Sequence, residues 1–138
     1  MTTTQVVETI AASADAVWDQ LSDFAGIEVG GPIESFEIEG EGVGAVRTIG
    51  LANGVVIERL DIHDAAAGTF TYSILNDDSP LPVTGYSATV IIIDTGDGNT
   101  TVEWTGTYEP QGPEEAAVAV VTGIYTGAIA RARDALTS

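Results

Sequence analysis

The chain has 138 residues, which fits a single domain spanning residues 1–138, and no repeat or low-complexity tract divides it. It has 21 Asp and Glu against four Arg and no Lys, so its net charge of −17 disfavours binding to nucleic-acid phosphates or anionic membranes. The lack of cysteine excludes disulfides, thiolate zinc sites and a cysteine nucleophile. An apolar fraction of 44% predicts a folded core.

The strong acidity has two explanations that the sequence leaves open. One is adaptation to high salt, where screening weakens the repulsion among carboxylates. The other is ordinary acidic drift in a genome that prefers Arg to Lys. The first residues lack the basic and apolar segments of a signal peptide, so we expect a cytoplasmic protein. The longest apolar run, residues 116–130, is interrupted by Thr and Gly and is too short to span a bilayer comfortably.

The chain starts with a predicted strand at residues 5–10 and an amphipathic helix from the N-cap Ser13 to Gly26. A short second helical turn is expected before Gly30. Turn residues then separate six further predicted strands, at residues 33–39, 45–52, 55–62, 69–75, 83–93 and 101–109. A long helix is predicted at about residues 113–136. We expect it to cover the sheet with a side formed by Val120, Val121, Ile124 and Ala128.

Alternation along the later strands predicts an inner sheet face rich in aromatic side chains, because residues two apart share a face. This set includes Phe70, Tyr72, Tyr86, Trp104 and Tyr108. These rings either line a cavity or fill a core, and Tyr86 is the strongest candidate for a ligand contact. Ile92 and Val102 both belong to the inner face, so the loop between their strands must have an odd length or contain a bulge.

The pair Asn53-Gly54 predicts a tight hairpin turn, because both central residues of such a turn need positive φ. This turn would place Ile49 opposite Glu58 and Arg47 opposite Leu60. Arg47 and Glu58 would then be diagonal neighbours on the inner face, within reach of each other. Buried charges are costly unless they are paired, so the two residues form either a structural ion pair or a functional site.

We expect no metal site and no cofactor. The single histidine, His63, stands between Asp61 and Asp64 at a strand end, which predicts a surface position. Residues 94–99 have glycine at the third and fifth positions, where a calcium-binding EF-hand loop needs oxygen ligands, so a simple hairpin loop is predicted. The sequence contains no phosphate-binding glycine loop, dinucleotide fingerprint or serine-triad motif.

Several short motifs occur in an order that points to a known family. They are Gly44-Ala45-Val46-Arg47, Glu58-Arg59-Leu60, Tyr72, and Leu81-Pro82 followed by Tyr86. In this order the chain resembles the polyketide cyclase/dehydrase branch of the START-like superfamily, which is also similar to plant lachrymatory factor synthase. The resemblance implies an α+β helix-grip fold. In that fold a curved antiparallel sheet of about seven strands wraps a long C-terminal helix, with short N-terminal helices.

The resemblance also implies a cavity open at one end, into which Arg47 and Glu58 point like the inward arginine and glutamate of the synthase. Many relatives carry Trp-His-Pro where this chain has Gly30-Gly31-Pro32, so two large side chains near the pocket are absent here. The segment at residues 76–82, polar and rich in turn residues, is expected to border the mouth of the cavity.

These features predict a protein that binds a small hydrophobic molecule in an internal cavity. The expected catalytic residues are Glu58, which moves a proton, and Arg47, which holds an oxygen with help from Tyr86, in a cofactor-free cyclisation, dehydration or isomerisation. The expected ligand contacts are Tyr72, Tyr86, Trp104, Tyr108 and Ile124. A carrier or sensor without turnover is the alternative, and a co-chaperone-like module would require an exposed apolar patch. The oligomeric state stays open.

Overall fold

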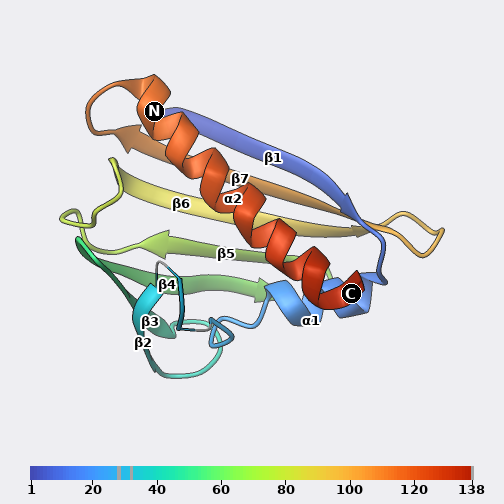
Figure 1. The fold of residues 1–138 in the computed structure, drawn as a ribbon. Helices are drawn as coiled ribbons and strands as arrows, with labels where there is room; N and C mark the ends of the chain where they lie inside the picture. The colour runs from blue at the N-terminus through green and yellow to red at the C-terminus, as the bar shows by residue number, and fades with distance from the viewer. Residues whose placement is uncertain (28, 32, 138) are drawn as a thin grey trace.

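A computed structural model of the protein describes residues 1–27, 29–31 and 33–137 (Figure 1). The described residues form one antiparallel sheet in the order β1-β7-β6-β5-β4-β3-β2, together with two helices. The elements are β1 (Thr2–Ile10), α1 (Ala14–Leu21), β2 (Ile33–Glu39), β3 (Val46–Leu51), β4 (Gly54–Asp64), β5 (Thr69–Ile74), β6 (Val83–Asp94), β7 (Thr100–Pro110) and α2 (Glu114–Thr137). These bounds agree with the predicted elements to within a few residues at most ends.

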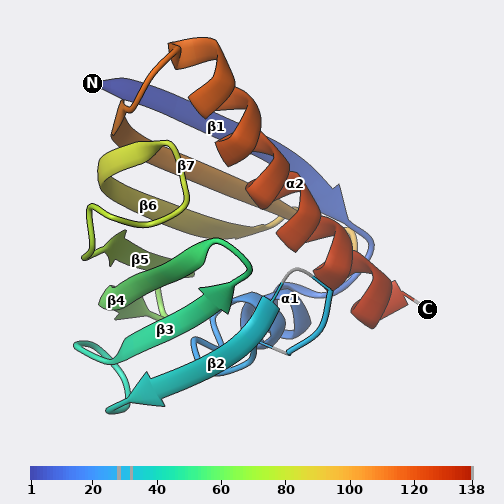
Figure 2. The same ribbon diagram turned by 60° about the vertical axis from the view of Figure 1, so that its left-hand side comes forward.

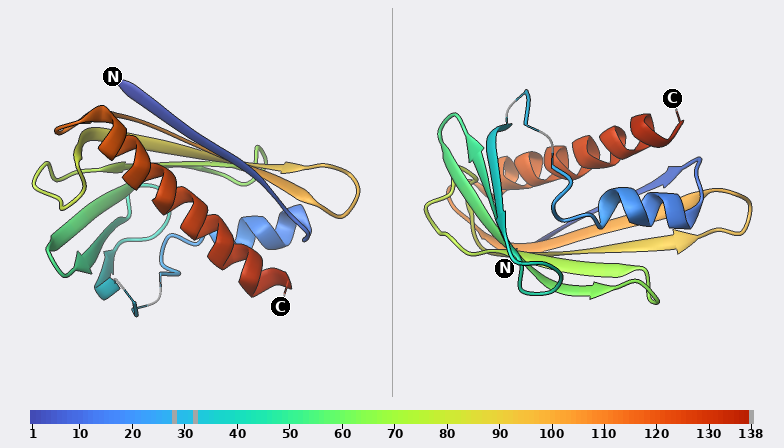
Figure 3. Two further views of the ribbon diagram at one scale, coloured as in Figure 1. Left: turned by 45° about the horizontal axis from the view of Figure 1, so that its top comes forward. Right: turned by 90° about the horizontal axis from the view of Figure 1, so that it is seen from below.

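Helix α2 crosses the concave side of the sheet diagonally, and α1 lies on the same side near the C-terminal end of α2 (Figures 1 and 2). Seen from below, the sheet bends so that β2 and β3 rise toward the helix side (right panel of Figure 3). The buried core lies between this curved sheet and α2. The α+β helix-grip fold that the resemblance implies is therefore confirmed.

The side of α2 that faces the sheet agrees only in part with the predicted one: Val121 is buried and Ala128 packs against the core, as predicted. The buried residues of the helix recur mostly at intervals of four, and they are Ala117, Val121, Tyr125, Ile129 and Ala132. Val120 and Ile124 remain 39% and 38% exposed, although the sequence analysis placed them against the sheet. The prediction followed the aliphatic residues, whereas the helix buries a line that includes an aromatic residue with a polar tip.

The hairpin between β3 and β4 has a different register from the predicted one. Leu51 pairs with Gly54, so the turn residues are Ala52 and Asn53, and Arg47 lies directly opposite Glu58. Gly54 takes a positive φ of +148°, whereas no described non-glycine residue, Asn53 included, has positive φ. The turn therefore starts one residue earlier than an Asn-Gly turn would. A shift of two pairing positions leaves every side chain on its predicted face.

The loop between β6 and β7 has an odd number of residues, as predicted. Ile92 pairs with Val102, both face the core, and residues 95–99 form a loop of odd length after the last pair, Asp94 with Thr100. The second helical turn expected before Gly30 does not occur among the described residues after α1. The positions Glu28 and Pro32 lie outside the described residues.

Candidate functional site

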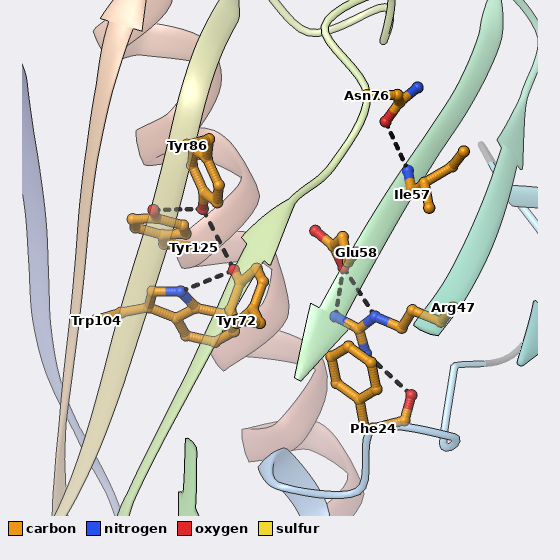
Figure 4. A network of polar contacts seen from close by, with 9 residues as sticks. All are labelled: Phe24, Arg47, Ile57, Glu58, Tyr72, Asn76, Tyr86, Trp104 and Tyr125. Carbon is orange, nitrogen blue, oxygen red and sulfur yellow. Dashed lines mark hydrogen bonds and ion pairs between the residues drawn. The ribbon is translucent and has the colours of Figure 1, made fainter. Parts of the chain in front are cut away.

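The centre of the candidate site is the ion pair between Arg47 on β3 and Glu58 on β4, which both point to the concave side (Figure 4). Arg47 Nε donates a hydrogen bond to Glu58 Oε1 at 2.8 Å, and Arg47 Nη2 lies 2.7 Å from the same oxygen. The side chains of Arg47 and Glu58 are only 13% and 10% exposed. The structure thus brings together the two residues that the sequence predicts as catalytic.

A third residue fixes the guanidinium group. Arg47 Nη1 donates to the backbone oxygen of Phe24 at 3.1 Å, and the guanidinium carbon lies 3.9 Å from the centre of the Phe24 ring. These contacts add a cation–π interaction to the ion pair. Local sequence patterns do not predict this role of Phe24, because a residue after α1 reaches β3 only through the tertiary fold.

Both guanidinium contacts use a single carboxylate oxygen of Glu58. The other oxygen, Oε2, has no hydrogen-bond partner among the described residues. A carboxylate accepts several hydrogen bonds, so Oε2 is a free acceptor on an acid whose side chain is only 10% exposed. This geometry suits Glu58 to accept a hydrogen bond or a proton from a bound molecule.

Beside the ion pair lies a chain of buried hydroxyl groups that joins the sheet to α2 (Figure 4). Trp104 Nε1 donates to the Tyr72 hydroxyl at 3.2 Å. The Tyr72 and Tyr86 hydroxyls lie 3.3 Å apart, and those of Tyr86 and Tyr125 lie 2.5 Å apart. We call Tyr72, Tyr86 and Tyr125 the tyrosine chain; they are 3%, 5% and 0% exposed.

Burial raises the pKa of all three phenols of the tyrosine chain well above the ordinary value. For Tyr72, the negative charge of Glu58 raises the pKa further, whereas the Tyr86 hydrogen bond, the Arg47 charge and the Trp104 hydrogen bond oppose the rise. For Tyr86, the phenols of Tyr72 and Tyr125 add to the effect of burial. The tyrosine chain is therefore neutral near pH 7 and serves as a set of hydrogen-bonding groups.

Tyr125 reaches the sheet because β7 has a glycine at the contact point. A Cβ atom built on Gly106 would collide with the Tyr125 hydroxyl oxygen. The sequence analysis missed Tyr125, although two signals were present: its spacing of four from Val121 and Ile129 on the helix, and a glycine inside a strand, which marks a close approach.

The other predicted ligand contacts have different surroundings. Tyr108 is fully buried, and its hydroxyl lies 2.6 Å from Thr4 Oγ1, apart from the tyrosine chain. Trp104 belongs to the core and stacks on the Tyr125 ring, with centroids 5.1 Å apart. Ile124 lies beside the buried stripe of α2 with 38% of its surface exposed.

The predicted enclosed cavity between Arg47, Glu58, Tyr72 and Tyr86 does not appear among the hollows found in the described structure. Of the two best-defined hollows in the described residues, one of about 490 Å³ lies against Glu114, Glu115 and Val118, and one of about 280 Å³ lies between the start of α1 and the turn after β4. The aromatic side chains themselves occupy the space between sheet and helix, with the Tyr72 and Tyr86 ring centroids 6.0 Å apart. Strand alternation predicts which side chains face inward but not how completely they fill the interior.

The segment after β5, which the sequence analysis expects at the mouth of the cavity, is anchored at its start. Asn76 Oδ1 accepts a hydrogen bond from the Ile57 backbone N–H at 2.9 Å, and Asn76 Nδ2 donates to the Val55 backbone oxygen at 2.9 Å. This side chain continues the pairing with β4 past the end of β5 (Figure 4).

His63 is exposed, as predicted, and its ring lies 5.1 Å from that of Trp18. Within the described part of the chain, no group of three or more His, Asp and Glu side chains is placed to hold a metal ion. Neither described helix has the length and apolar character needed to cross a membrane.

A long C-terminal helix on a curved seven-stranded sheet, with an acid–base pair on the concave side, places the protein in the helix-grip class. The family model described as "Polyketide cyclase / dehydrase and lipid transport" matches residues 1–137. The chain belongs to this family. A search of curated proteins found no match.

Several solved structures share this fold. An uncharacterised protein from Bacillus thuringiensis is 29% identical with a TM-score of 0.84, and the match covers 99% of this chain and 100% of that one. XoxI from Bacillus cereus is also 29% identical with a TM-score of 0.84, over 99% and 96% of the two chains. Norcoclaurine synthase from Thalictrum flavum, in complex with dopamine and hydroxybenzaldehyde, is 21% identical with a TM-score of 0.77, over 98% and 85%. At 21% identity, the similarity to norcoclaurine synthase shows only that the two proteins share a fold.

Proposed function

We propose that the protein binds a small hydrophobic molecule on the concave side of the sheet and that this molecule donates a polar hydrogen to Glu58 Oε2. The family and the fold suggest hydrophobic ligand binding. The main observation that supports the proposal is the geometry of the ion pair: Arg47 contacts only Oε1 of Glu58 and leaves Oε2 free. An ion pair with a purely structural role gains most when both oxygens are bonded.

The same geometry supports proton transfer. Glu58 is held by Arg47, Arg47 is held by Phe24, and Oε2 needs no rearrangement of the pair to take a proton from a ligand and return it. Such a proton transfer would serve an enzyme that catalyses a cofactor-free cyclisation, dehydration or isomerisation. A carrier or sensor would use the same hydrogen bond without turnover.

A ligand that enters between the sheet and α2 beside Glu58 displaces packed side chains, because aromatic rings occupy that interior. Tyr72 and Tyr86 are the proposed ligand contacts nearest to the ion pair. Ile124, which is partly exposed on the flank of α2, is a proposed contact at the edge of the site. Binding is therefore coupled to a rearrangement of packed side chains, and the cost of that rearrangement is subtracted from the affinity.

The first experiment is native mass spectrometry of the protein purified from its own host, because a co-purifying molecule identifies the ligand class. Turnover, dissociation constant and melting temperature are then measured for the wild type and for Glu58→Gln. This change keeps an acceptor oxygen but removes the titratable proton, so an enzyme should lose about 10²- to 10⁴-fold in rate with little change in affinity.

The matched control is Glu37→Gln, which removes an exposed carboxylate from β2. It should leave turnover, affinity and melting temperature unchanged. A Glu58→Gln variant that turns over substrate at the wild-type rate would remove Glu58 from the catalytic role. A variant that binds the ligand normally, in a protein without measurable turnover, would favour the carrier.

A further inference from the structure

Together with Trp104, the tyrosine chain has one more hydrogen-bond donor than it has hydrogen-bonded contacts. Each of its three phenols carries one O–H, and the chain contains two hydroxyl–hydroxyl contacts, each of which uses one of these hydrogens. Trp104 brings its own N–H and occupies an acceptor position on Tyr72. One buried O–H is therefore left without an acceptor among the described residues.

Such an O–H is a strong recognition element. A buried donor without a partner loses its interaction with water and gains nothing in return. A guest molecule that supplies an acceptor oxygen recovers this loss, which corresponds to about 5- to 150-fold in affinity.

The free O–H is best presented at the Tyr72 end of the chain. The Tyr125 hydroxyl lies against the β7 backbone at Gly106, and the Tyr86 hydroxyl lies between its two neighbours. If Tyr125 donates to Tyr86 and Tyr86 donates to Tyr72, then Tyr72 accepts from both Tyr86 and Trp104 and keeps its own hydrogen for a guest. In this direction the free hydrogen lies at the end of the chain next to the ion pair, whereas the reverse direction would leave it on Tyr125, which is fully buried against the β7 backbone.

Tyr72 also lies next to the ion pair. Glu58 pairs with Ile74 and Tyr72 pairs with Leu60, so Glu58 and Tyr72 are diagonal neighbours on the concave side, with backbones about 7–8 Å apart. The Arg47 guanidinium carbon lies 5.7 Å from the centre of the Tyr72 ring. The site thus offers an acceptor at Glu58 Oε2 and a donor at Tyr72, separated by an apolar, aromatic surface.

We infer that the ligand carries a carbonyl-type oxygen, separated from its polar hydrogen by an apolar body of one or two rings, and that this oxygen accepts a hydrogen bond from Tyr72. This inference rests on the proposed function at Glu58 and narrows its ligand to hydroxy-carbonyl compounds.

The test uses four naphthalenes of similar shape as probes. The first, 2-ethylnaphthalene, has neither polar group, and 2-acetylnaphthalene has only the carbonyl acceptor. The third, 6-ethyl-2-naphthol, has only the hydroxyl donor, and 6-acetyl-2-naphthol has both groups. Dissociation constants are measured by calorimetry for the wild type, Tyr72→Phe and Thr4→Val. Thr4 is buried and its hydroxyl is bonded to Tyr108, outside the tyrosine chain, so Thr4→Val removes a buried hydroxyl group away from the site and is the matched control. The C=O stretching frequency of bound 2-acetylnaphthalene reports its hydrogen bond directly.

The wild type and Thr4→Val should bind the acetyl compounds at least about 5-fold more tightly than their ethyl counterparts. In both proteins the C=O frequency of the bound probe should be lower than in Tyr72→Phe, where the preference for acetyl should disappear. Equal binding of acetyl and ethyl probes, as expected if a buried water satisfies the O–H, would overturn the inference. So would a C=O shift that persists in Tyr72→Phe. If none of the four probes binds, the proposed function itself is wrong.

Discussion

Arg47 and Glu58 face each other across β3 and β4, and both guanidinium contacts converge on the single oxygen Oε1. The same guanidinium group stacks on Phe24 and donates to its backbone oxygen. One side chain thus ties two strands to the segment after α1. This arrangement makes Arg47 a structural residue whether or not Glu58 acts on a ligand.

Removing Arg47 alone should destabilise the protein strongly. Arg47→Met leaves the Glu58 carboxylate nearly buried without its partner, and breaking a buried pair in this way costs about 3–5 kcal/mol. The double change Arg47→Met with Glu58→Leu should recover most of this loss, because no unpaired charge remains. Urea denaturation of the purified variants gives the free energies of unfolding.

The control for this prediction is Arg59→Met on β4. Arg59 pairs with Asp61 at 2.7 Å, but its side chain is 48% exposed, so its removal should cost less than about 1 kcal/mol. If Arg47→Met is no more damaging than Arg59→Met, the ion pair with Glu58 contributes little to stability.

Gly106→Ala should destabilise the fold through Tyr125. The new Cβ would collide with the Tyr125 hydroxyl, and forcing extra atoms into a packed core costs about 1–3 kcal/mol. Adding Tyr125→Phe should restore only part of the stability, because the ring carbon Cζ would still lie 3.2 Å from that Cβ. The melting temperatures of the single and double variants measure the coupling.

Gly123→Ala on α2 is the matched control for this glycine. A Cβ at Gly123 meets no atom within 4 Å, so alanine should stabilise the helix by about 0.5–1 kcal/mol. Equal effects of the two substitutions would show that Tyr125 does not need the space at Gly106.

Local patterns predicted the fold well because strand alternation and turn residues are encoded close together in the sequence. They also predicted that Arg47 and Glu58 share the concave side, even though the hairpin register was wrong. The error amounted to two pairing positions, and side-chain direction repeats with that period. The prediction of the site therefore depended on which face of the sheet each residue occupies, and not on the exact pairing register of the two strands.

The features that local patterns missed depend on contacts between distant segments. Phe24 meets Arg47 only when the chain after α1 folds against β3. Tyr125 becomes part of the site because Gly106, on another element, leaves room for it. The filling of the interior depends on ring volumes and on the spacing between sheet and helix, and neither quantity follows from a hydrophobic pattern.

The acidic composition predicts a stability that increases with salt. With a net charge of −17, repulsion among carboxylates destabilises the compact state, and potassium chloride screens it. The melting temperature should therefore rise between low and molar potassium chloride. A midpoint that stays constant or falls over this range would contradict adaptation to high salt and favour acidic drift.

The tyrosine chain predicts a loss of stability at alkaline pH. In the unfolded chain the phenols ionise near the ordinary pKa of 10.0, whereas burial raises the pKa values of Tyr72, Tyr86 and Tyr125 in the folded protein. The folded state then holds protons that the unfolded state has lost. The resulting stability is fully present below about pH 10 and decreases as the pH rises further, by up to about 1.4 kcal/mol per pH unit for each tyrosine.

The measurement follows phenolate absorbance and circular dichroism in parallel while the pH is raised from about one unit below to about three units above the ordinary tyrosine pKa. Absorbance from the three phenols should appear only together with the loss of folded signal. The urea-unfolded protein, titrated under the same conditions, should ionise near pH 10 and serves as the control. If all tyrosines ionise near pH 10 while the circular dichroism stays native, the tyrosine chain is accessible to solvent and does not hold a buried donor for a ligand.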